Sequence, residues 1–211
     1  RCMRARLRVS SAPCRSSQNH RPMSRHLRIA LAGFVALCLN PAFAKVEVEA
    51  AQQKNLGNIL IVKVSEDIAP GDYDAMLKAL RAHPGKFARK ILLLDSIGGS
   101  AAEAMRMGRL LRETGFVALV ASNAVCQGSC VYLLAAGQSR TIRGAVGLHR
   151  PAYPGGDSSL GAEQARQQRY NPQHYLREMG VSAQLFRDMQ AIAPHSPRLL
   201  SALERSRYGL H

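Results

Sequence analysis

The feature that most constrains the fold is an alternation of short apolar runs with amphipathic stretches. Residues 89–96 form a continuous apolar run, which is typical of a strand covered on both faces, whereas residues 100–115 carry apolar side chains at helical spacing and end at a glycine. Strands that alternate with helices predict an α/β fold with a mostly parallel sheet. We expect strands at 58–64, 89–96, 116–122, 140–144 and 145–149, helices at 70–85, 100–115 and 129–137, and C-terminal helices after residue 158.

The first 44 residues differ in composition from the rest, because they contain eight arginines and no acidic residue. From Met23 a basic head, an apolar centre and an Ala-x-Ala ending at Ala44 follow one another in the order of a secretory signal peptide. The apolar centre is too short for a permanent bilayer anchor. We therefore expect 23–44 to be a signal peptide removed after Ala44, and 45–211 to be one exported domain, placed in the periplasm.

Residues 1–22 precede this signal start, and we interpret them as a mis-assigned start or an artificial extension. Two alternatives are an uncleaved leader that lies at a membrane surface and a lipoprotein. Leu37 before Cys38 argues against the lipoprotein, because a small residue is expected at that position.

The net charge falls from +15 for the whole chain to +7 for residues 45–211, which hold 21 basic and 14 acidic side chains. The basic residues are scattered and few aromatic residues lie among them, so nucleic acid is not an expected partner. About 167 residues suffice for one domain with a proper core. Membrane contact is expected only through an uncleaved leader, and a homo-oligomer remains an open alternative.

Two cysteines, Cys126 and Cys130, remain after the leader. In an oxidising compartment they are expected to form a disulfide. Positions four apart in a helix are near the upper limit of disulfide geometry, so we expect Cys126 in a turn before the helix. No second Cys or His pair has zinc-site spacing, so neither a metal nor another cofactor is expected.

Three candidate features follow successive predicted strands: the Gly98–Gly99 turn, Ser129 and His149. Each has a simple structural interpretation, as a tight turn, a helix cap and a polar strand end. Their joint order is the informative observation. Glycines at a helix start expose backbone N–H groups to a ligand, and a serine beside an imidazole is a potential nucleophile.

The sequence around these features resembles the proteolytic subunit of Clp protease, in the crotonase-like superfamily. The motifs that carry the resemblance are Ser96-Ile97-Gly98-Gly99, the run "GSCVYLLAAGQSR", His149-Arg150-Pro151 and the ending "ALERSRYGL". It covers roughly residues 58–211 and is greatest for exported Clp-protease-like proteins. It implies a crotonase-like superhelix of repeated ββα units, and an ATP-independent serine hydrolase that acts on peptides or proteins.

The resemblance also implies roles for particular residues. Ser129 would be the nucleophile and His149 its general base, and the backbone N–H groups of Gly99 and Cys130 would form the oxyanion hole. The segment containing Ile97, Gly98 and Ser100 would bind an extended peptide.

The family's catalytic aspartate is not evident. Counting back from the "YGL" ending places it at or near Pro197. Asp157 and Asp188 are the nearest acids, and Asp188 is expected to face solvent from a helix. Ser196 or a backbone carbonyl could instead orient His149. The alternative function is therefore a non-catalytic peptide-binding or scaffold protein that retains the fold.

Other catalytic schemes fit the sequence less well. An α/β-hydrolase elbow requires glycines where Gln127 and Val131 stand, and a Ser-Lys dyad requires a lysine after Lys90, the last one in the chain. A catalytic cysteine would be oxidised after export. Acyl-CoA hydration suits the superfamily but requires CoA, which is cytosolic.

Overall fold

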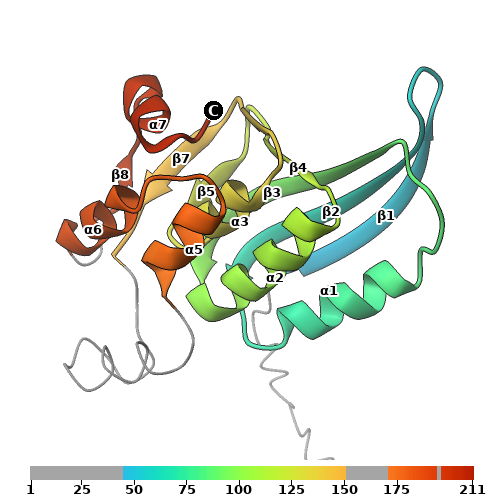
Figure 1. Cartoon of the computed structure of the whole chain (residues 1–211), viewed down its shortest axis with the longest axis horizontal. Helices are drawn as coiled ribbons and strands as arrows, with labels where there is room; N and C mark the ends of the chain where they lie inside the picture. The colour runs from blue at the N-terminus through green and yellow to red at the C-terminus, as the bar shows by residue number, and fades with distance from the viewer. Residues whose placement is uncertain (1–44, 151–170, 194–195) are drawn as a thin grey trace, which may run out of the picture. The chain divides into compact units, whose positions relative to one another are not determined.

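Two parallel strands, β2 (Gly57–Ile68) and β3 (Arg89–Gly99), form the middle of the sheet in the computed structural model (Figure 1). The structure describes residues 45–150, 171–193 and 196–211, which all belong to one compact unit. Leu60, Val62 and Val64 of β2 and Leu92 and Leu94 of β3 are buried. This burial explains why these β-branched and aliphatic runs form strands.

The eight-stranded sheet has the order β1-β2-β3-β5-β7-β8, with β4 beside β3 and β6 beside β4. Five of its pairings are parallel, whereas β1–β2 and β7–β8 are antiparallel. The prediction of an α/β fold with a mostly parallel sheet is therefore confirmed. The remaining strands are β1 (Lys45–Gln53), β4 (Val117–Val120), β5 (Val125–Gln127), β6 (Arg140–Ile142), β7 (Ala145–Leu148) and β8 (Arg198–Leu199).

The helices pack on this sheet and on one another. In Figure 1, α1 and α2 lie side by side next to β1 and β2, and α2 also packs against the buried helix α3. Every residue of α3 is buried, so the central candidate segment is part of the core. The helices are α1 (Asp72–Arg81), α2 (Ala101–Glu113), α3 (Cys130–Ala136), α5 (Pro172–Glu178), α6 (Gln184–Ala191) and α7 (Ala202–Tyr208).

Three strands were not expected from the sequence. β1 is an edge strand formed by pairing along its whole length with β2. β5 and β8 have only three and two residues, too few to give a periodic pattern. β8 lies in a segment that was expected to be helical, and its pairing with β7 determines its conformation.

The end of β3 also differs from the expectation of a turn at residues 97–100. β3 continues to Gly99 because its ladder with β2 resumes after an irregularity, with Asp67 opposite Gly98 and Ile68 opposite Gly99. The irregular residue, Glu66, has a positive φ of 63°. A bulge of this kind bends a strand and redirects its end.

Several expectations concern residues outside the described ranges. They are the signal peptide at 23–44, the segment 1–22 before it, and the helical stretch between 158 and 170. Within the described ranges, no helix has both the length and the apolar character needed to cross a membrane.

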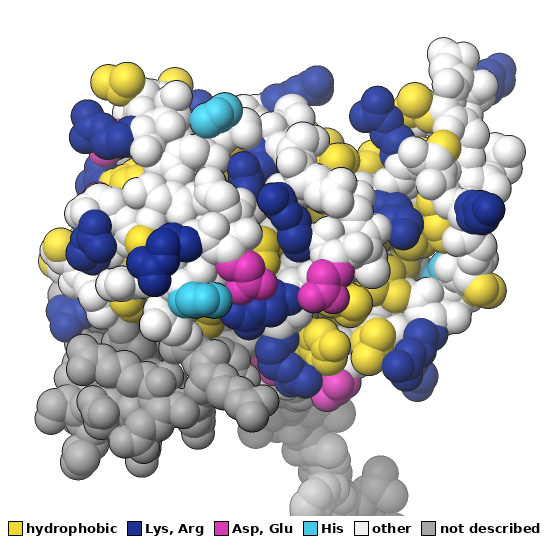
Figure 2. Space-filling model, in the orientation of Figure 1, with side chains coloured by type: hydrophobic (Ala, Val, Ile, Leu, Met, Phe, Trp, Pro, Cys, Tyr) yellow, Lys and Arg dark blue, Asp and Glu magenta, His cyan; other side chains and the backbone are white. Residues whose placement is uncertain are grey.

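Basic side chains are dispersed over the face drawn in Figure 2. Lys and Arg occur there as separate groups, interspersed with acidic, apolar and uncharged surface. On this face they form no continuous stripe of the kind that tracks a nucleic-acid backbone.

Candidate functional site

The three features singled out in the sequence lie at one edge of the sheet. Ser96 of β3 pairs with Cys126 of β5, and Gln127 of β5 pairs with Gly147 of β7, both in parallel register. Parallel strands end at the same edge, so the residues that follow them are brought together. A Cβ added at Gly98 would lie 3.0 Å from the Ser129 backbone nitrogen.

His149 joins the same cluster through Gly128. A Cβ added at Gly128 would lie 3.4 Å from the Cβ of His149 and 3.3 Å from the carbonyl oxygen of Ile97. Gly128 also has a positive φ of 53°, and its N–H donates to the Gly147 carbonyl oxygen at 3.2 Å. The turn before Ser129 therefore lies between the end of β3 and the end of β7.

Ser129 occupies the N-cap position of α3, but its side chain does not cap the helix. Its hydroxyl donates instead to the carbonyl oxygen of Gly99 at 2.8 Å, and the residue is only 6% exposed. Within residues 45–150, no hydrogen bond joins this hydroxyl to His149. The helix-cap interpretation is thus wrong for the side chain, because the hydroxyl donates its hydrogen bond to a backbone carbonyl of β3.

The glycines at the end of β3 are required by space and by backbone conformation. Gly98 and Gly99 have φ values of 117° and 116°, a backbone conformation that residues other than glycine rarely adopt. A Cβ on Gly99 would lie 2.3 Å from the Ile68 carbonyl oxygen. The Gly98 N–H donates to Ser96 Oγ at 3.2 Å, and the Ser96 hydroxyl donates to the Glu66 carbonyl oxygen. Ser96 therefore fixes the end of β3 to Glu66 of β2, at the irregularity in their pairing.

A disulfide links Cys126 and Cys130, whose Cα atoms are 5.3 Å apart. Cys126 lies in β5 and Cys130 is the first residue of α3, so Cys126 is outside the helix as expected, although in a strand rather than a turn. Both residues are fully buried. The first N–H groups of a helix lack intrahelical partners, which leaves the Cys130 N–H suited to a ligand oxygen.

The position of Pro197 relative to His149 follows from the register of β7 and β8. β7 and β8 pair with Gly147 opposite Leu199 and Leu148 opposite Arg198. Continuing this antiparallel register by one residue sets Pro197 opposite His149. Proline has no carboxylate with which to orient an imidazole, and neighbouring Ser196 is exposed.

Asp188 does not fill this role. It lies in α6 and is half-buried rather than facing solvent, which corrects the expectation from the sequence. Its Oδ2 accepts a hydrogen bond from the Tyr208 hydroxyl at 2.5 Å, and its Oδ1 accepts one from Gln184 Nε2 at 2.7 Å. These two bonds, the Tyr208 bond above all, hold the pKa of Asp188 below its usual value. Asp157 and Pro151 lie outside the described residues.

The expected peptide-binding positions differ in their exposure. The Ile97 side chain is 57% exposed, as a binding surface requires. Ser100 is instead the N-cap of α2, and its side chain accepts a hydrogen bond from the Glu103 N–H at 3.3 Å. Two surface hollows of about 320 and 390 Å³ involve other parts of the described chain, and neither Ser129 nor His149 lines them.

Glu103 was missed in the sequence, although the Ser-x-x-Glu spacing of Ser100 and Glu103 is a signature of a helix start. Its carboxylate is buried and contacts the turn before α1. In the described part of the chain, no group of three or more His, Cys, Asp or Glu side chains could hold a metal ion.

Comparison with models of known protein families gave no match, and no curated protein matches the chain.

Proposed function

We propose that the chain is an exported, ATP-independent serine hydrolase of the Clp-protease type, acting on peptides with a crotonase-like fold. The observation that carries this proposal is the convergence of the Gly98–Gly99 turn, Ser129 and His149 at one sheet edge. A serine, a histidine and backbone N–H donors near one another are the groups that acyl transfer requires. The compartment, the periplasm, follows from the leader and is compatible with the disulfide.

In the proposed reaction the Ser129 hydroxyl first turns from the Gly99 carbonyl oxygen toward His149. His149 takes the proton as Ser129 Oγ bonds to the substrate carbonyl carbon, and the N–H groups of Gly99 and Cys130 stabilise the oxyanion. His149 then gives the proton to the leaving amine or alcohol, and an acyl-enzyme forms. Water, activated by His149, hydrolyses the acyl-enzyme and restores Ser129.

Two observations favour the second candidate, a peptide-binding protein without catalysis. The Ser129 hydroxyl is held by a backbone carbonyl, and position 197, which the β7–β8 register would set opposite His149 if it were continued, is a proline without a carboxylate. A dyad without an acid is expected to turn over slowly, because loss of the carboxylate costs about 10⁴ in rate in a Ser-His-Asp site. We therefore expect measurable hydrolysis of activated esters and little of unactivated peptides.

A fluorophosphonate probe separates the two candidates, because it labels only an activated serine. Protein made in an oxidising compartment should be labelled at Ser129, and Ser129→Ala should abolish the labelling. His149→Ala should slow it about 100-fold or more, as expected for loss of a general base. Labelling that persists in Ser129→Ala, or no labelling of the folded wild type, would refute the enzyme.

Cys130→Ala tests the thiol alternative in the same assay. The proposed oxyanion donor is the backbone N–H at this position, which alanine retains, so labelling should largely persist. Loss of labelling in folded Cys130→Ala together with labelling of Ser129→Ala would transfer the role to the thiol.

A further inference from the structure

We propose that Glu103 is a positioning residue, which fixes the Gly98–Gly99 segment at the distance from Ser129 that the oxyanion hole needs. The catalytic part of this inference rests on the proposed function. The positioning part rests on contacts between α2, the turn before α1 and the end of β3.

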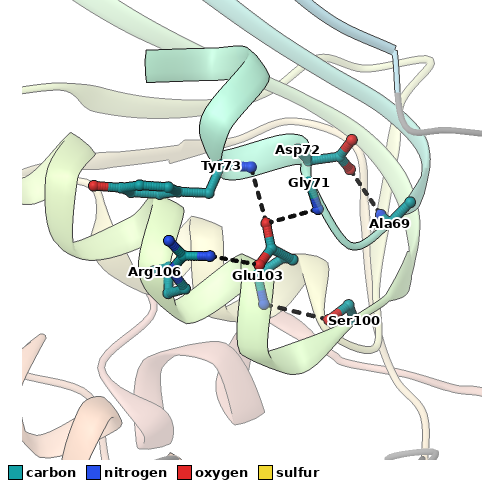
Figure 3. A network of polar contacts seen from close by, with 7 residues as sticks. All are labelled: Ala69, Gly71, Asp72, Tyr73, Ser100, Glu103 and Arg106. Atoms are coloured by element: carbon teal, nitrogen blue, oxygen red, sulfur yellow. Dashed lines mark hydrogen bonds and ion pairs between the residues drawn. The ribbon is translucent and has the colours of Figure 1, made fainter. Parts of the chain in front are cut away.

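The Glu103 carboxylate connects α2 to the turn before α1 (Figure 3). Its Oε2 accepts hydrogen bonds from the backbone N–H groups of Gly71, at 3.3 Å, and Tyr73, at 2.9 Å. Its Oε1 accepts one from Arg106 Nη1 at 3.0 Å. The residue is 7% exposed, and a carboxylate this buried is stable only when such partners satisfy it.

Two further contacts make the turn rigid. Asp72 Oδ2 accepts a hydrogen bond from the Ala69 N–H at 2.7 Å. Burial raises the pKa of Asp72, the Ala69 N–H opposes this shift, and the nearby Glu103 carboxylate adds to it. The guanidinium of Arg106 lies 4.2 Å from the centre of the Tyr73 ring. The turn is therefore fixed by hydrogen bonds to its backbone N–H groups and by a contact of the Tyr73 side chain.

This turn begins at Ile68, the residue that lies against Gly99. The Ser100 N–H donates to the Ile68 carbonyl oxygen at 2.7 Å, and the space next to the Gly99 Cα is filled by the Ile68 backbone. Ser100 also caps α2 through the Glu103 N–H. The Glu103 carboxylate thus holds the turn that continues Ile68, whose backbone lies against Gly99. The bond from Glu103 to Ser100 is made by the backbone N–H, so any residue at position 103 retains it.

The position of this segment determines the proposed chemistry. Removing one oxyanion donor costs about 10²–10³ in rate, and displacement by a fraction of an ångström weakens the same bond. A Glu103 variant that folds should therefore bind substrate normally and react slowly.

The test compares Glu103→Ala with Glu103→Gln and with Glu178→Ala as a matched control. Glu178 also pairs with an arginine of α2, Arg109 at 3.1 Å, but lies away from the turn before α1. Two readouts are needed: the rate of fluorophosphonate labelling together with kcat and KM on an activated ester, and hydrogen exchange of the Gly98 and Ser100 amides.

We expect Glu103→Ala to be labelled about tenfold or more slowly than wild type. On the activated ester its kcat should fall while its KM stays unchanged. The Gly98 and Ser100 amides should exchange their hydrogens faster. Glu178→Ala should match wild type within about twofold. Glu103→Gln keeps one oxygen that accepts from the turn and should lie in between, and it decides the question if Glu103→Ala does not fold.

Unchanged labelling or unchanged exchange in the Glu103 variants would overturn the proposal. If the wild type is not labelled, the proposed function fails separately, and amide exchange alone decides whether Glu103 positions the segment. Faster exchange at Gly98 and Ser100 in Glu103→Ala, without a change in Glu178→Ala, would then support it.

Discussion

At the scale of single residues, the two polar backbone groups of Gly99 have different relations to Ser129. Its carbonyl oxygen accepts the Ser129 hydroxyl, whereas its N–H is the proposed oxyanion donor. A neutral carbonyl holds the hydroxyl but cannot take its proton. In the proposed mechanism, the reactivity of Ser129 depends on how well His149 competes for that proton, and an acid beside His149 would strengthen the imidazole as a base.

Pro197→Asp tests this directly. The carboxylate would lie opposite His149 in the extended β7–β8 register and would stabilise the imidazolium. We expect labelling of Ser129 by a fluorophosphonate to accelerate at least about tenfold, a small part of the ~10⁴ that the acid contributes in a complete triad. Pro197→Asn, which adds the same shape without the charge, is the control. Equal rates for the two variants would show that position 197 does not reach His149.

At the scale of elements, the C-terminal helices are joined by polar contacts. Asp188 of α6 accepts the hydroxyl hydrogen of Tyr208 in α7. Ser201 and Glu204 form a capping box at the start of α7, and Arg198 of β8 pairs with Glu204. The Ser201 backbone N–H first, and then Arg198, lower the pKa of Glu204 to about 2. These contacts hold α6, α7 and β8 together.

Asp188→Asn should destabilise the protein at neutral pH and not in acid. The pKa of Asp188 is depressed in the fold, so its stabilisation is complete above the unfolded value of about 3.9 and is lost as pH falls through the folded value. We expect a loss of about 1 kcal/mol at pH 7, below the usual range for a hydrogen bond to a charged group because Asp188 is only half-buried. Urea unfolding from pH 7 to pH 2 measures it. If the difference in unfolding free energy between Asp188→Asn and wild type stayed constant over this pH range, the stabilising role of the charged Asp188 would be contradicted. Fluorophosphonate labelling of Ser129 should be the same in both proteins.

At the scale of the whole molecule, Arg140 of β6 connects elements that are far apart in the sequence. Its guanidinium donates to the carbonyl oxygens of Leu134 and Ala135 in α3, Met179 at the end of α5 and Gly209 after α7, at 2.6–3.2 Å. Burial first, and then the nearby Arg112, lower the pKa of Arg140. The hydrogen bonds compensate for the buried charge and orient the C-terminal segment against α3.

Arg140→Met should therefore lower the stability of the whole fold. Four carbonyl oxygens lose a charged donor, and we expect a loss of about 3 kcal/mol or more, which corresponds to a fall in Tm of about 6 °C or more. Arg143→Met, at an exposed position, is the control and should shift Tm little. Thermal unfolding followed by circular dichroism measures both. Similar Tm values for the two variants would show that the four contacts contribute no net stability.

Most of the α/β framework could be predicted from local patterns in the amino-acid sequence. Local patterns identify β2, β3, β4 and α2. A strand buried on both faces has a continuous run of apolar residues, whereas a helix buried on one face has apolar residues every three or four positions. The disulfide could also be predicted from the sequence, because two cysteines four positions apart can be linked only in a few backbone conformations. The candidate residues Gly98, Gly99, Ser129 and His149 were found by their order after successive strands.

The contacts of these residues depend on the three-dimensional packing of the chain and could not be predicted from local patterns. β1, β5 and β8 exist through pairing with partners distant in the sequence, and such pairing leaves no local period. The bond from Ser129 to Gly99, the pairing of Leu148 with Arg198, and the contacts of Glu103 with Gly71 and Tyr73 join residues about 30 or more positions apart. Sequence patterns record which face of an element is buried, whereas hydrogen bonds between elements depend on how those faces meet.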